Sequence, residues 1–170
     1  MSDCIRVLVL LSEGGAHRYG ELAVPLLRAL DAYPGIEPVV ARSADELDRL
    51  EGFQVVLAAS DDALPEAAAR ALADHRRRGG GLVLLHSTPT AWARTAAGAA
   101  VAGWAPGGEE LPEAELAVAV LPGSQVTDRL DREIFIRDRL PESDGIPEQA
   151  VPLLEANWRY SRRPAGFALV

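Results

Sequence analysis

Three short, uninterrupted apolar runs constrain the fold most: IRVLVLLS (5–12), FQVVLAAS (53–60) and GLVLLH (81–86). Runs of this length without polar alternation are typical of strands that are buried on both faces, as in a parallel sheet. A further strand is predicted at 36–42, and helices are predicted at 21–33, after the capping-box pair Ser43 and Glu46, and at 65–79. This alternation of strand and helix predicts an α/β fold, an open parallel sheet with helices on both faces.

The alternation of strand and helix stops after a loop at 103–115. The segments ELAVAVL (115–121), REIFIRD (132–138), AVPLLEA (150–156) and AGFALV (165–170) resemble strands with no long helix between them. They predict an antiparallel C-terminal extension of the parallel sheet. Because 170 residues suffice to bury one core, we predict a single domain over 1–170.

Composition excludes several classes of function. The net charge is −8 and the basic residues are scattered apart from Arg76–Arg78, so no nucleic-acid partner is expected. The sequence has no Lys, which excludes a Schiff base, lysine-bound pyridoxal phosphate and a Walker phosphate site. The single cysteine, Cys4, excludes an intrachain disulfide and is expected to be a small buried residue.

The origin and location of the protein are also constrained by the sequence. The apolar run that follows Asp3 is too short for a membrane span and lacks the basic flank of a signal peptide. We therefore expect a cytoplasmic protein with no membrane partner. The many Ala and Arg residues indicate a GC-rich bacterial source.

Polar residues follow the predicted strands at their carboxyl ends, where parallel sheets bind their ligands. His86 ends the third run and is followed by Ser87 and Thr88, of which Thr88 can cap the next helix. The candidate binding residues in the other two loops are Glu13, Gly14, His17 and Asp61. His86 is either a site residue or a polar group that only closes the strand, and spacing alone leaves both readings open. His75, at the Arg-rich end of a helix, is expected to be solvated.

Five segments carry a resemblance to a known family: RVLVLLSEGGAHRYG, RRRGGGLVLLHS, AGWAPG, VTDRLDREIFIRDRL and NWRYSRRPAGFALV. In their order and spacing the chain resembles the ThuA-like (trehalose utilisation) family of the class I glutamine amidotransferase-like superfamily. The resemblance covers nearly the whole chain and is most specific in the Gly-Gly-Gly-strand-His segment. It implies a flavodoxin-like sandwich, a role in carbohydrate metabolism, and functional positions at His17, His86 and Asp138.

Three departures from the family pattern bear on the site. The segment GWAPGGEE (103–110) lacks the histidine that usually follows this tryptophan, GFALV lacks the usual Gly-His, and Arg139 stands where the acidic signature has glutamate. A zinc site needs three or four nitrogen, oxygen or sulfur ligands. We therefore expect no metal and no other cofactor. The alternative is zinc held by His17, His86 and Asp138 with Glu13 or Asp61.

The glutamine chemistry of the superfamily is excluded. It needs a cysteine at a Gly-x-Cys-x-Gly elbow, and the corresponding turn here is His86-Ser87-Thr88. A serine nucleophile at Ser87 is not supported either, because the flanking glycines are missing. The neighbouring His86 is also expected to point the other way along an extended chain.

Two classes of function remain. In the first, a small sugar or keto-sugar lies over the strand ends, with His86 as general acid or base, Asp138 or Glu13 orienting it, and Trp104 as a stacking face. The other residues expected to bind it are Gly14, His17, Asp61, Ser87 and Thr88. In the second, the chain is a degenerate, non-catalytic module that binds a ligand or a partner protein. Whether the protein forms a homodimer is left open.

Overall fold

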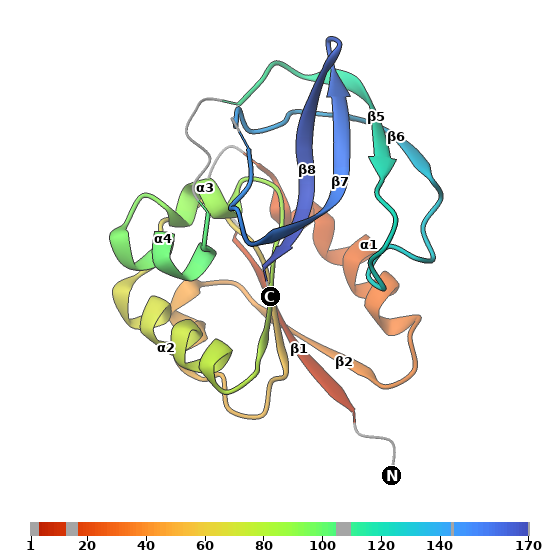
Figure 1. Cartoon of the computed structure of the whole chain (residues 1–170). Coiled ribbons are helices and arrows are strands. Elements are labelled where there is room, and N and C mark those ends of the chain that lie inside the picture. Colours follow the sequence, from red (N-terminus) through yellow and green to blue (C-terminus); the bar gives the residue numbers. More distant parts are fainter. Residues whose placement is uncertain (1–3, 13–16, 105–109, 144, 170) are drawn as a thin grey trace. The chain divides into compact units, whose positions relative to one another are not determined.

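The computed structural model describes residues 4–12, 17–104, 110–143 and 145–169 (Figure 1). Its contacts group into two compact units, residues 1–105 and 106–170, which are described separately below. The single domain expected over 1–170 stays a prediction. Within the described ranges, no helix combines the length and the hydrophobicity needed to cross a membrane.

Unit 1 is built around a four-stranded parallel sheet in the order β2-β1-β3-β4. Its elements are β1 (Ile5–Leu11), α1 (Tyr19–Asp31), β2 (Ile36–Ala41), the 3-10 helix η1 (Ala44–Asp48), β3 (Val55–Ala59), α2 (Glu66–Arg77), β4 (Gly81–Leu84), α3 (Thr88–Trp92) and α4 (Ala96–Ala102). The predicted order of strands and helices is confirmed. The capping box of Ser43 and Glu46 is also present, although it opens a 3-10 helix.

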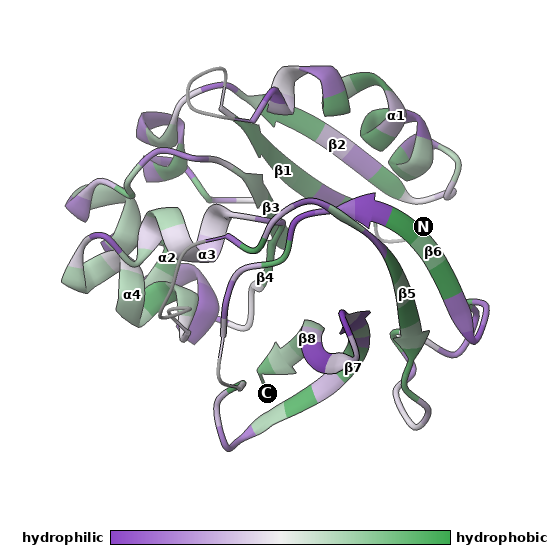
Figure 2. Ribbon diagram, turned by 90° about the horizontal axis from the view of Figure 1, so that it is seen from above, coloured by the Kyte–Doolittle hydropathy of each residue, from purple (hydrophilic) through white to green (hydrophobic). Residues whose placement is uncertain are grey.

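Both faces of the parallel sheet are covered, as predicted. Leu8 and Leu10 of β1 belong to a core cluster that also contains residues of η1, α2, α3 and α4. The alternate residues Val7 and Val9 belong to a second cluster, which includes residues of α1. Figure 2 shows the hydrophobic colouring along β1. The core forms with few aromatic residues, because Val, Leu and Ala fill most of both clusters.

The three glycines before β4 have distinct roles at the end of α2. Gly79 has φ +89°, a left-handed conformation that suits the residue after a helix. A Cβ on Gly80 would overlap the imidazole of His75, whereas a Cβ on Gly81 would meet Val55 more loosely. The glycine at position 80 therefore makes room for a buried ring.

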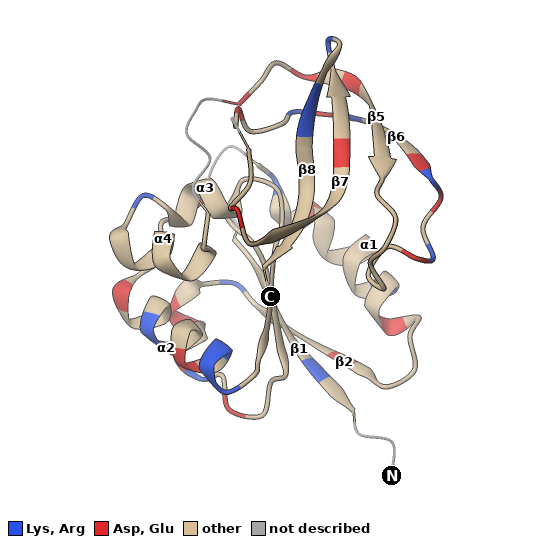
Figure 3. Ribbon diagram, in the orientation of Figure 1, with Lys and Arg blue, Asp and Glu red and all other residues tan. Residues whose placement is uncertain are grey.

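The expectation that His75 is solvated is wrong. Its residue is only 3% exposed, although the basic residues of α2 lie mainly toward the same end of the helix (Figure 3). Ala68, Leu72 and His75 share one face of α2, because they are four and three residues apart, and that face packs on the sheet. Burial, with a smaller effect from the charge of Arg78, lowers the pKa of His75, while a hydrogen bond with the Gly81 backbone opposes this.

Unit 2 is a four-stranded antiparallel sheet in the order β6-β5-β7-β8, which confirms the predicted antiparallel strands without long helices between them. Its strands are β5 (Ala114–Val120), β6 (Glu133–Asp138), β7 (Ala150–Trp158) and β8 (Ser161–Leu169). A separate core of Leu111, Leu116, Val118, Leu140 and Ala156 lies on one face. Trp158 packs against this core and donates from its indole nitrogen to the Pro112 carbonyl (3.3 Å).

Three smaller expectations are corrected. Cys4 is exposed rather than buried, because it precedes β1 and lies outside both clusters of unit 1. The helix predicted from residue 65 begins one residue later, because Pro65 is the N-cap of α2. Pro25 lies inside α1, which begins two residues earlier than predicted and runs through the proline.

Candidate functional site

A cluster of polar side chains lies at the carboxyl ends of the parallel strands in unit 1. Asp61 follows β3, His86 and Ser87 connect β4 to α3, and His17 and Tyr19 stand at the start of α1. Their side chains are joined by hydrogen bonds and ring contacts. The parallel register explains this convergence, because β1, β3 and β4 all end at the same edge of the sheet.

The carboxylate of Asp61 is the centre of the cluster. It accepts hydrogen bonds from the backbone nitrogen of His17 (2.8 Å), from His17 Nδ1 (2.9 Å) and from the hydroxyl of Ser87. The Asp61 side chain is 10% exposed. Burial by itself would raise the pKa of Asp61, but the hydrogen bonds from Ser87 and His17, with the charge of the His17 ring, hold it below its ordinary 3.8. Asp61 is therefore ionised near neutral pH.

The ionised carboxylate fixes the direction of the other hydrogen bonds. A carboxylate only accepts, so both Ser87 Oγ and His17 Nδ1 donate to it. The single hydroxyl proton of Ser87 is then used, so the short contact between Ser87 Oγ and the Tyr19 hydroxyl is donated by Tyr19. The Tyr19 oxygen in turn accepts from His86 Nδ1 across 3.4 Å.

This order of donors determines the chemistry of both imidazoles. When each neutral ring carries its proton on Nδ1, its lone pair is on Nε2. The centroids of the His17 and His86 rings are 4.4 Å apart with planes at 63°, so the two rings meet edge to face. The cluster thus places two basic nitrogens close together and supports both rings from one carboxylate. The arrangement suits proton transfer.

The backbone of His86 adopts an unusual conformation. Its φ is +50°, which few residues other than glycine adopt. The expectation of an extended chain, with His86 and Ser87 pointing in opposite directions, is therefore wrong. Instead, the sharp turn between β4 and α3 lets both side chains reach the Tyr19 hydroxyl. The strain is concentrated at the residue where the sequence also predicted the site.

Thr88 has a structural position. Its side chain is fully buried, accepts from the Ser60 backbone nitrogen (2.8 Å) and donates to the Ala58 carbonyl (3.3 Å). These hydrogen bonds link the start of α3 to the end of β3. Because the side chain is buried, this position disagrees with the expectation that Thr88 contacts a ligand directly. Ser87, rather than Thr88, is the N-cap of α3, and its hydroxyl bonds Asp61 instead of the helix.

The other predicted site residues are found in several places along the chain. Trp104 is half-buried just after α4 in unit 1. Asp138 is the last residue of β6 in unit 2, where its carboxylate accepts from the Arg139 backbone nitrogen (2.8 Å). Glu13 and Gly14 lie outside the described residues. The roles expected of these four residues remain predictions.

Tyr19 is the member of the cluster that sequence reasoning missed. It is 3% exposed and stacks on His17, with ring centroids 5.4 Å apart. A phenol two residues after a candidate histidine was the available signal. The alternative of a zinc site stays a prediction, although an Asp-supported imidazole such as His17 is a typical metal ligand. Zinc would need further ligands beyond the two histidines.

No protein-family model matches the sequence, and no curated protein does. Solved structures do resemble it. A protein from Parabacteroides merdae described as ThuA-like matches with a TM-score of 0.72 and 16% identity, over 91% of this chain and 68% of that one. A ThuA-like protein from Bacteroides uniformis gives 0.65 and 16%, over 89% and 67%.

A third structure extends the likeness beyond the ThuA-like proteins. A protein from Thermoplasma acidophilum described as one of the chains of GMP synthase matches with a TM-score of 0.60 and 14% identity, over 98% of this chain and 78% of that one. These identities are low, so the likeness concerns the fold. The chain has the fold of the ThuA-like structures, which the GMP synthase chain shares, and the fold expected from the sequence is thereby confirmed.

Proposed function

We propose that this chain is a ThuA-like protein that binds a small sugar or keto-sugar at the carboxyl ends of β1, β3 and β4, and that His86 moves a proton on it. The hydrogen-bond chain from His86 through Tyr19 and Ser87 to Asp61 carries the proposal. It supports an imidazole whose Nε2 is the basic atom, at the edge of the sheet where parallel α/β folds bind ligands.

The residues of the cluster have different roles in this proposal. His86 Nε2 takes a proton from the carbon beside a substrate carbonyl or, when the ring is the imidazolium, gives one to a leaving oxygen. His17 binds a hydroxyl group through its own Nε2, because Asp61 already accepts from its Nδ1. Trp104 offers a stacking face, and the binding roles expected of Asp138, Glu13 and Gly14 stay predictions from the sequence. No dinucleotide fingerprint is present in the sequence, so proton transfer is favoured over hydride transfer.

A non-catalytic binding module is the second candidate. This candidate is supported by the hydrogen bonds within the cluster, because the Ser87 hydroxyl already bonds both Tyr19 and Asp61. In this case a ligand binds without being changed.

The test is thermal unfolding of the wild type with neutral sugars, keto-sugars and sugar acids, each with and without zinc. A ligand that binds only the folded state raises the melting temperature. The matched variant is His86→Asn, because asparagine tolerates the left-handed conformation at this position and removes only the imidazole. A shift in the wild type that is lost in His86→Asn supports the site, and no shift with any compound contradicts it.

The two candidates are then separated by chemistry. The ligand that shifts unfolding is incubated in D₂O with the wild type and with His86→Asn, and followed by proton NMR. Proton abstraction exchanges the hydrogen on the carbon beside the carbonyl for deuterium, and hydrolysis produces new signals. Either change in the wild type alone supports catalysis by His86. Binding with neither change supports the non-catalytic module.

A further inference from the structure

The edge strand β6 of unit 2 is unusual for an edge. Within the described part of the unit it pairs only with β5. Its middle is hydrophobic, and Phe135 is 76% and Ile136 38% exposed. Figure 2 shows this hydrophobic stretch between hydrophilic ends. Exposed hydrophobic edge strands are templates for pairing with another chain, and proteins ordinarily protect them with proline, a bulge or a covering segment.

The hydrogen-bond pattern shows which residues of β6 face away from β5. The Val120 nitrogen donates to the Arg132 carbonyl, and these two residues are opposite each other when the register of Ala119 and Glu133 is continued by one residue. In an antiparallel pair, opposite residues alternate between hydrogen-bonded and non-hydrogen-bonded pairs. Ile134 and Ile136 therefore bond to β5. The backbone groups of Glu133, Phe135 and Arg137 point to the open edge.

We propose that β6 pairs in antiparallel fashion with β6 of a second copy of this chain, about a two-fold axis at Phe135. The segment DREIFIRDR (131–139) is self-complementary in this register. Phe135 faces its own counterpart, and Ile134 faces Ile136 of the second copy. The charges then match at every position: Glu133 faces Arg137, Arg132 faces Asp138, and Asp131 faces Arg139. A two-fold axis repeats each pair, as an isologous dimer requires.

Neighbouring registers lack this match. The outward-facing residues must pair with one another, so the axis can move only by whole residues along the strand. An axis at Ile134 places Glu133 against Phe135, and an axis at Ile136 places Phe135 against Arg137. Both leave a charge opposite an aromatic ring. Opposite charges across a strand pair are stabilising and unmatched ones are not, so the axis at Phe135 is selected.

Arg137, the arginine nearest the proposed axis, remains accessible in the single chain. Arg137 contacts Glu113 through Nε (2.6 Å), yet its side chain is 74% exposed. A guanidinium has five N–H donors, so Arg137 can bond Glu133 of the second copy while it keeps this contact.

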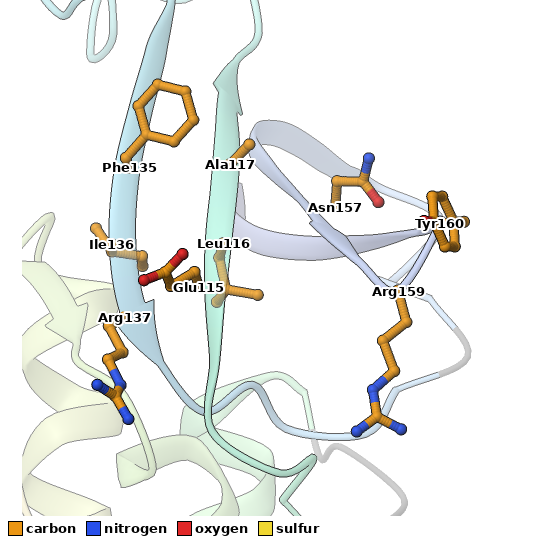
Figure 4. Close-up of a pocket in the computed structure, with 9 residues that line it drawn as sticks. All are labelled: Glu115, Leu116, Ala117, Phe135, Ile136, Arg137, Asn157, Arg159 and Tyr160. Carbon is orange, nitrogen blue, oxygen red and sulfur yellow. The ribbon is translucent and has the colours of Figure 1, made fainter.

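A groove lies on the face of the sheet next to the proposed axis. It has a volume of about 820 Å³ and runs over Ala117, the small residue that stands between Phe135 on β6 and Asn157 on β7 (Figure 4). In the dimer, the two Phe135 rings lie side by side at the rim of the two grooves. The pairing therefore joins two four-stranded sheets into one of eight strands and covers the exposed rings.

The test measures the oligomeric state by sedimentation velocity, with the whole chain and two variants. Glu133→Arg places arginine against Arg137 twice in the homodimer, and Arg137→Glu places glutamate against Glu133 twice. Each variant alone is expected to sediment as a monomer where the wild type is a dimer. An equal mixture of the two variants restores both opposite-charge pairs and is expected to dimerise. Recovery on mixing cannot come from misfolding.

The matched control is Arg162→Glu on β8, the other edge of the same sheet, because Arg162 also has one exposed ion pair within the chain, with Glu155. This variant is expected to remain a dimer. A wild type that is monomeric over the whole concentration range overturns the proposal. So does a dimer that survives both single variants, or a mixture that stays monomeric. The outcome is independent of ligand binding by unit 1.

Discussion

His17 and Asp61, which are 44 residues apart in the sequence, are joined through both the main chain and the ring of His17. The backbone nitrogen of His17 donates to one carboxylate oxygen of Asp61 (2.8 Å), and the ring Nδ1 donates to the other (2.9 Å). The pair connects the residues before α1 to the loop after β3. Asp61 thus fixes both the position of the His17 main chain and the orientation of its ring.

Asp61→Asn is expected to lower stability by about 2 kcal/mol at neutral pH, because hydrogen bonds to a charged acceptor are lost. The folded pKa lies below the ordinary 3.8, so the stabilisation is present above 3.8 and is lost as the pH falls through the folded pKa. Urea unfolding of both proteins measures this. The gap between them should narrow in acid, and a gap that is constant with pH contradicts the assignment.

Tyr19→Phe interrupts the chain between His86 and Ser87. We expect a loss of about 2 kcal/mol in stability, since both hydrogen bonds of the buried Tyr19 hydroxyl disappear, and a weaker response to the ligand that stabilises the wild type. Tyr33→Phe is the control, because it removes the same hydroxyl group from an exposed tyrosine just after α1. Equal behaviour of the two variants would remove Tyr19 from the site.

The lowered pKa of His75 predicts a second dependence of stability on pH. Its folded pKa is lowered, so the unfolded chain binds the proton more readily. Stability is therefore complete above the ordinary value of 6.5 and declines as the pH falls from 6.5 toward the folded pKa. His75→Leu should remove this decline in thermal unfolding. If the variant declines by the same amount, another group is responsible.

Gly80→Ala is expected to destabilise unit 1 by about 1–3 kcal/mol, because the added Cβ overlaps the His75 ring. Combination with His75→Ala removes the obstacle, so the second change should cost less in the double variant than alone. Denaturant unfolding of the four proteins measures this coupling. Gly145→Ala is a suitable control, because a Cβ there meets nothing nearby.

Much of the fold was predictable, because it follows from local patterns. The buried apolar runs identify β1, β3 and β4, and a parallel sheet necessarily brings their carboxyl ends together. This is why His17, Asp61, His86 and Ser87 could be placed at one edge. The His75 error was avoidable, because its spacing from Ala68 and Leu72 marks the buried face of α2 more reliably than its basic neighbours mark the surface.

Other features depend on contacts between distant segments. The left-handed φ of His86 arises from the turn into α3, and its neighbours in the sequence do not indicate it. The role of Tyr19 depends on Ser87, 68 residues away. The self-complementary sequence of β6 was visible from the start, but only the topology shows that this strand is an edge.

The most direct test of the account is the protonation of the two histidines in the cluster, read from long-range ¹H–¹⁵N correlation spectra. The sequence contains only three histidines, so the signals can be assigned with His75→Leu and His86→Asn. The account predicts that neutral His17 and His86 both carry the proton on Nδ1 and the lone pair on Nε2. Protons on Nε2 of both rings would contradict the hydrogen-bond chain that ends at Asp61.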